Sequence, residues 1–102
     1  MEKILYDGYE KRLRVIVWLM TRPDGSIEIR KIDKGVYIDD IFGTDERECL
    51  ISIEKSEFAR LSDDPKKFFA DMAERFSTRD SYELFRNMLN EKGIKYSEDD
   101  FC

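Results

Sequence analysis

The stretch LRVIVWLMTRPDGSIEIRKI (residues 13–32) decides the fold. Over residues 13–20 the side chains alternate with a period of two and β-branched residues are frequent, which is typical of a β-strand. In the second half of this strand both faces are apolar. That pattern indicates a central strand, or a strand with one face covered by helices and the other partly covered.

A tight turn interrupts the apolar pattern at residues 22–26. Pro23 presets the backbone for a turn and Gly25 is able to take the left-handed conformation that a three-residue hairpin loop needs. The resulting hairpin keeps the apolar residues of its two strands in phase, which supports its register. It makes these pairs: Leu19 with Ile29, Thr21 with Ile27, Trp18 with Arg30, and Met20 with Glu28.

Weaker strand signals lie on either side of this hairpin. Residues 4–6 predict a short first strand, and Asp7-Gly8 predicts a turn after it. Residues 33–47 are typical of a loop with short extended pieces. Alternating apolar residues over 49–53 predict another strand, and residues 94–96 are a further short candidate.

The second half of the chain carries helix signals. Ser56 is a candidate N-cap of a short helix, and Asp64-Pro65 predicts the start of a longer one. Residues 77–80 form a break, and Gly93 ends the last helix. The apolar residues of these segments recur at helical spacing: Phe58, Leu61, Phe68, Phe69, Met72, Ala73, Phe76, Tyr82, Phe85, Met88 and Leu89.

Strands first and helices last predict an α+β fold. We expect an N-terminal antiparallel sheet of three to four strands packed against two to three C-terminal helices. The 102 residues fit one domain. We place that domain at residues 1–97 and an acidic C-terminal tail at residues 98–102.

The charge distribution argues against nucleic acid as a partner. The net charge is −5, and the chain has 18 basic and 23 acidic side chains. Phosphate binding needs clustered Lys and Arg, and the nearest cluster, Lys11, Arg12 and Arg14, stands beside Glu10. The longest apolar run, residues 15–20, is far shorter than a membrane span.

The N-terminus lacks the long apolar segment of a signal peptide, so we expect a cytoplasmic protein that binds no membrane. Cys49 and Cys102 are the two cysteines. A secreted, disulfide-dependent domain has a denser framework, so this usage predicts two free thiols in a reducing compartment.

Familiar catalytic arrangements are excluded by composition. The sequence contains no histidine, which removes the commonest general base and the usual zinc ligands. It also contains no phosphate-binding glycine loop and no C-x-x-C pair. We therefore expect no catalytic residue, no cofactor and no metal.

Two features are candidate partner-binding sites. One is the acidic segment 39–48, because acidic loops steer association with cationic surfaces. Its carboxylates offer oxygen ligands for a divalent cation, but their spacing differs from that of an EF-hand. The other is the outer strand face with its Trp and Met, which are favoured at interfaces. The candidate residues are Asp39, Asp40, Asp45, Glu46, Glu48, Trp18 and Met20.

The acidic segment DDIFGTDERE (residues 39–48) resembles an acidic Phe-Gly-x-Asp-Glu-x-Glu turn found in a group of small bacterial α+β proteins. The ending LNEKGIKY (residues 89–96) is similar to that group's helix followed by Gly-Ile-x-Tyr. Arg47 stands where the group has an aromatic residue. The resemblance implies a bacterial source and a compact α+β fold, and it carries no activity or catalytic residue to this chain.

These observations lead to three functional hypotheses. The first is a small, acidic, non-enzymatic protein-interaction module, for example an immunity-like or inhibitor protein that binds a basic partner. The second is a small ligand-binding domain or carboxylate-based enzyme with a pocket between the sheet and the helices. The third is a homodimer formed through the outer sheet face at Trp18.

Overall fold

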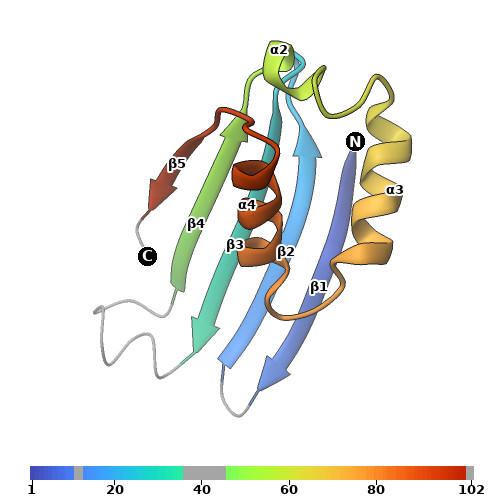
Figure 1. Ribbon diagram of the computed structural model, residues 1–102. Helices are drawn as coiled ribbons and strands as arrows, with labels where there is room; N and C mark the ends of the chain where they lie inside the picture. Colours follow the sequence, from blue (N-terminus) through green and yellow to red (C-terminus); the bar gives the residue numbers. More distant parts are fainter. Residues whose placement is uncertain (11–12, 36–45, 101–102) are drawn as a thin grey trace.

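A computed structural model describes residues 1–10, 13–35 and 46–100, and these residues form a sheet with helices on one side (Figure 1). The strands are β1 (Glu2–Glu10), β2 (Leu13–Thr21), β3 (Ile27–Gly35), β4 (Glu46–Ile53) and β5 (Ser97–Asp100). The helices are α2 (Lys55–Phe58), α3 (Pro65–Arg75) and α4 (Ser81–Glu91). The α+β prediction is confirmed, with five strands in place of the three to four expected.

The strands lie in the order β1-β2-β3-β4-β5, and every neighbouring pair is antiparallel. The predicted hairpin register between β2 and β3 is confirmed, including the Trp18–Arg30 and Met20–Glu28 pairs. Gly25 has φ of 86°, and its N–H donates to the Arg22 carbonyl. The turn therefore has the left-handed residue that the sequence predicts.

The two faces of the sheet have different surroundings. Figure 1 shows α3 and α4 on the same side of the sheet, with α3 beside β1 and α4 across β3. We call this side the inner face and the opposite side the outer face. The inner face supplies the buried strand residues: Val15, Val17, Leu19, Ile27, Ile29, Cys49, Ile51 and Ile53.

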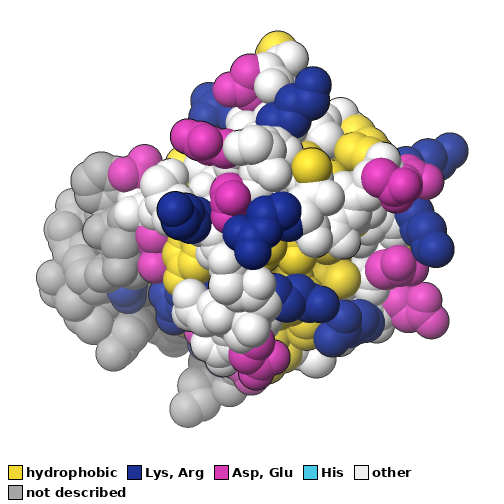
Figure 2. Space-filling model, turned by 45° about the horizontal axis from the view of Figure 1, so that its top comes forward, with side chains coloured by type: hydrophobic (Ala, Val, Ile, Leu, Met, Phe, Trp, Pro, Cys, Tyr) yellow, Lys and Arg dark blue, Asp and Glu magenta, His cyan; other side chains and the backbone are white. Residues whose placement is uncertain are grey.

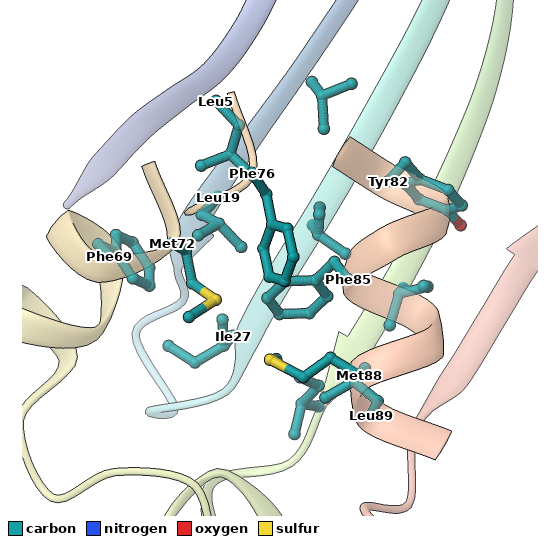
Figure 3. Close-up of a cluster of buried hydrophobic side chains, with 14 of the residues drawn as sticks. Leu5, Leu19, Ile27, Phe69, Met72, Phe76, Tyr82, Phe85, Met88 and Leu89 are labelled. Atoms are coloured by element: carbon teal, nitrogen blue, oxygen red, sulfur yellow. The ribbon is translucent and has the colours of Figure 1, made fainter. Parts of the chain in front are cut away.

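Aromatic side chains fill the space between the sheet and the helices. Phe68 meets Phe58 edge to face at 5.0 Å between ring centroids and meets Phe85 at 6.2 Å. Such edge-to-face pairs add to the free energy gained by burying the rings. Figure 3 shows side chains of α3, including Met72, and of α4, including Phe85, pointing into this one cluster.

Local signals set the ends of the two longer helices, as predicted. The Asp64 carboxylate accepts a hydrogen bond from the Lys67 N–H at 3.2 Å, which caps α3. Gly93 has φ of 68° after α4, and the Ile94 N–H donates back to the Leu89 carbonyl. A left-handed glycine with this bond is the usual way to satisfy the last carbonyls of a helix.

Two predicted boundaries near the strands are wrong. Asp7 and Gly8 form no turn, because β1 continues through them and pairs with β2 up to Glu10. A side chain at Gly8 would meet the hydroxyl end of the Tyr6 side chain, which would have to move to make room. Ser56 is not an N-cap, because α2 begins at Lys55 and has Glu54 at its N-cap position.

The predicted acidic tail is wrong for residues 98–100. Ser97–Asp100 forms β5 and pairs with β4, from Ser52–Ser97 to Cys49–Asp100. The short strand that we expected at residues 94–96 forms instead at residues 97–100. Backbone pairing, which is independent of side-chain type, holds an acidic segment at the sheet edge.

The prediction of free thiols is also wrong, because Cys49 is disulfide-bonded. Its side chain is buried on the inner face of β4. The other cysteine of the chain, Cys102, lies outside the described residues. Among the residues that are described, no helix is long and apolar enough to cross a membrane.

Replacing Phe85 with Ala should lower the free energy of unfolding by about 3–5 kcal/mol, because the ring is fully buried and its removal leaves a cavity. Leu84→Ala, on the exposed side of the same helix, should cost less than about 1 kcal/mol. Urea unfolding followed by circular dichroism measures both values. Equal losses would contradict the position of Phe85 in the core.

Candidate functional site

The predicted partner-binding residues that the structure describes all lie on the outer face. Trp18 and Met20 alternate along β2 with the buried Val17 and Leu19, so they point away from the helices. On β4, Glu46 and Glu48 pair with outward positions of β3. The remaining predicted residues, Asp39, Asp40 and Asp45, lie outside the described residues.

Trp18 is the second residue of a row that crosses all five strands and ends at Asp99 of β5. Its direct neighbours are Ile4 on β1 and Arg30 on β3, and Arg30 pairs in turn with Leu50 on β4. Ile4 is 59% exposed and Trp18 is half-buried. The apolar residues of this face, which we call the outer apolar residues, are Ile4, Ile16, Trp18, Met20, Ile32 and Leu50.

A chain of ion pairs crosses the same face. Arg22 and Arg30 both contact the Glu28 carboxylate, and Arg30 also binds Glu48 at 2.9 Å. The Glu28 side chain is only 1% exposed, whereas that of Arg30 is 30% exposed. The two guanidinium groups therefore lie over a carboxylate that no helix covers, and they supply the charge that a buried carboxylate needs.

Other carboxylates of the outer face are paired in the same way. Lys34 lies 3.2 Å from Glu46, and Arg14 donates two hydrogen bonds to Asp7, at 2.9 and 3.0 Å. These hydrogen bonds from Arg14 hold the pKa of Asp7 below its ordinary value. The described part of this face is therefore a surface of mixed charge with an apolar centre.

The inner face carries a polar cavity of about 260 Å³ between the end of β3 and the start of α4. Lys31 on β3 binds Glu83 on α4 at 3.1 Å. Figure 3 shows the Tyr82 oxygen pointing away from the hydrophobic cluster, and it donates to Glu98 of β5 at 2.7 Å. Asp33 also lines this cavity.

Asp33 is the most deeply buried carboxylate of the cavity, with 7% of its surface exposed. Burial raises the pKa of Asp33, and the charges of Lys31 and Arg47 oppose this effect. The sequence analysis missed this residue. The available signal was the inward row of β3, which changes from the apolar Ile27 and Ile29 to Lys31 and Asp33.

A wider hollow of about 570 Å³ lies beside α2, where the β2–β3 turn approaches the segment before β5. Asp24 accepts hydrogen bonds there from the hydroxyl and the N–H of Ser26, and these lower the pKa of Asp24. Glu57 is likewise occupied by the Lys95 N–H and by Arg60. Figure 2 shows Lys, Arg, Asp and Glu side chains intermingled on this side of the molecule.

No protein-family model, curated protein or solved structure matches the chain.

Glu28→Gln should lower the free energy of unfolding by about 1–3 kcal/mol, because it removes the charge that Arg22 and Arg30 share. Glu74→Gln makes the same chemical change on the exposed surface of α3 and should cost less than about 0.5 kcal/mol. Urea unfolding measures the difference. A Glu28 variant as stable as the Glu74 variant would contradict the ion-pair chain.

Asp33→Asn should raise the free energy of unfolding near pH 7. The folded state has the higher pKa at this carboxyl, so the charged form costs stability above that pKa. The cost disappears as the pH falls below the ordinary value of 3.8, and the gain of the variant should disappear with it. Urea unfolding of both proteins across this pH range tests the sign.

The matched control for this experiment is Asp71→Asn, which removes a carboxylate from the exposed surface of α3. It changes the net charge equally and should leave the stability nearly unchanged at every pH. Destabilisation by Asp33→Asn near neutral pH would contradict the account of the buried carboxylate.

Proposed function

We propose that this protein is a non-enzymatic protein-interaction module that binds its partner on the outer face of the sheet. The observation that carries the proposal is the position of Trp18 and Met20. They lie with four further apolar residues on the face opposite α3 and α4.

The composition of this face supports an interface. Trp and Met are enriched in the buried centres of protein interfaces, and Trp is among the residues that contribute most binding energy. The ion-paired Arg30 and Glu28 lie directly beside Trp18 and Met20, so charged groups and the apolar residues share this surface. Trp18 is thus the expected anchor, with Ile4 and Leu50 as its flanking contacts.

The charge of the chain supports a basic partner. The net charge is −5, and Glu46 and Glu48 follow the acidic segment that begins at Asp39. Because Lys34 and Arg30 already pair with these two glutamates, the expected role of the acidic side is to steer encounter rather than to supply most of the affinity. An immunity-like or inhibitor protein that acts on a basic target is the most concrete form of this proposal.

We assign the protein to no cellular compartment. Disulfides persist mainly in oxidising compartments, and Cys49 is disulfide-bonded. The cytoplasmic expectation rested partly on free thiols, so it is not part of the proposed function.

Trp18 is the only tryptophan of the chain, so its fluorescence reports directly on the outer face. A partner isolated from the source cells on immobilised protein should shift the Trp18 emission to shorter wavelength and protect it from acrylamide. Trp18→Ala should weaken binding by about thirtyfold or more, as expected for an interface anchor. Binding should also weaken as the NaCl concentration rises.

Leu84→Ala is the matched control, because it removes an exposed apolar side chain from α4. It should bind like the parent protein. The proposal fails if the Trp18 and Leu84 variants, both checked for folding by circular dichroism, retain the same proteins equally. It also fails if sedimentation reveals a dimer that Trp18→Ala dissociates, since a second copy would then occupy the face.

A further inference from the structure

The polar cavity of the inner face contains two carboxylates that are only partly satisfied. It lies on the opposite side of the sheet from the proposed partner surface, and β3 and the N-terminal half of α4 form much of its lining. Asp33 points into it from β3, and Glu83 points into it from α4. Arg47 and Cys49 of β4 and Glu98 of β5 complete the lining, so four elements that are far apart in the sequence build the cavity.

Most polar groups around the cavity already have partners. Lys31 binds one oxygen of Glu83, Oε1, at 3.1 Å. Glu98 accepts hydrogen bonds from the Tyr82 hydroxyl at 2.7 Å and from Arg86 at 2.9 Å. These pairs fix the positions of the groups that surround Asp33.

Asp33 differs from these neighbours. It is 93% buried, since only 7% of its surface is exposed. Within residues 1–10, 13–35 and 46–100 its carboxylate accepts no hydrogen bond and forms no ion pair, although the charges of Lys31 and Arg47 act on it. The second Glu83 oxygen, Oε2, is also buried without a hydrogen bond. A buried acceptor without a donor, such as Oε2 of Glu83, is costly, and in folded proteins it usually meets a donor.

We propose that this cavity binds a small primary ammonium compound, which donates hydrogen bonds to the carboxylate of Asp33 and to Oε2 of Glu83. A primary ammonium group has three N–H donors and a positive charge, so it can satisfy both carboxylates at once. The volume of about 260 Å³ lies below the usual range for drug-sized ligands and limits the compound to a few non-hydrogen atoms.

An organic ammonium fits these residues better than a metal ion does. Within the described ranges, no three His, Cys, Asp or Glu residues are placed to share a metal. Calcium needs six to eight oxygen ligands, whereas Asp33 and Glu83 offer two carboxylates in a cavity that Lys31, Arg47 and Arg86 also line. The raised pKa of Asp33 is consistent with a site in which an added positive charge stabilises the carboxylate.

The test uses the full chain and three probes: ethylammonium, tetramethylammonium and sodium, each as its chloride. Amide shifts in two-dimensional NMR spectra are followed during titration at constant ionic strength. Ethylammonium should cause saturable shifts at residues around Asp33 and Glu83. Tetramethylammonium, which is cationic but has no N–H donor, should cause none beyond those of sodium.

Asp33→Asn should weaken ethylammonium binding at least about tenfold, as expected for the loss of a charged hydrogen-bond acceptor. The same variant should be more stable than the parent near pH 7, so lost binding would not reflect unfolding. Asp71→Asn should bind like the parent. Equal shifts from ethylammonium and tetramethylammonium, no saturable shift at all, or full binding by the Asp33 variant would each overturn the proposal.

Discussion

The register of the β2–β3 hairpin is the constraint on which both faces of the sheet depend. The left-handed Gly25 closes the turn, and the pairs that follow place Leu19 beside Ile29 on the inner face. A slip of one residue would exchange the two faces of a strand. It would carry Glu28 and Arg30 into the hydrophobic cluster and expose Ile27 and Ile29, so the core itself excludes the alternative register.

The outer face shows how long charged side chains can cover a sheet face against which no helix packs. Glu28 lies among long side chains, and the guanidinium groups of Arg22 and Arg30 lie over it. The aliphatic parts of such side chains cover apolar surface while their charged ends remain in contact with water. This arrangement restricts the free apolar surface to the neighbourhood of Trp18 and leaves few carboxylates without a counter-charge. Affinity for a partner would then come mainly from apolar contact, and the net negative charge would act on the rate of encounter.

The sequence predicted those parts of the structure whose causes are local. Pro23 and Gly25 determine a turn, and Asp64-Pro65 and Gly93 mark helix ends, because each acts within a few residues of itself. The common face of Trp18 and Met20 followed from strand alternation alone. By contrast, β5 is acidic and has little strand propensity, so only its pairing with β4 makes it a strand. That pairing depends on where the chain returns after α4, which no local pattern encodes.

The cavity was missed for the same reason, and its chemistry depends on a contact between distant segments. Lys31 and Asp33 break the apolar pattern of the inward row of β3, and Glu83 meets that row only because α4 crosses β3. A polar interruption of this kind costs stability unless its charges are compensated. On the outer face Glu28 forms ion pairs with two arginines, whereas on the inner face Asp33 forms none among the described residues and only the charges of Lys31 and Arg47 act on it. One strand therefore carries a carboxylate with ion-pair partners on one side and a carboxylate without them on the other. The carboxylate without ion-pair partners is the position at which the structure gives up stability that a bound donor would restore.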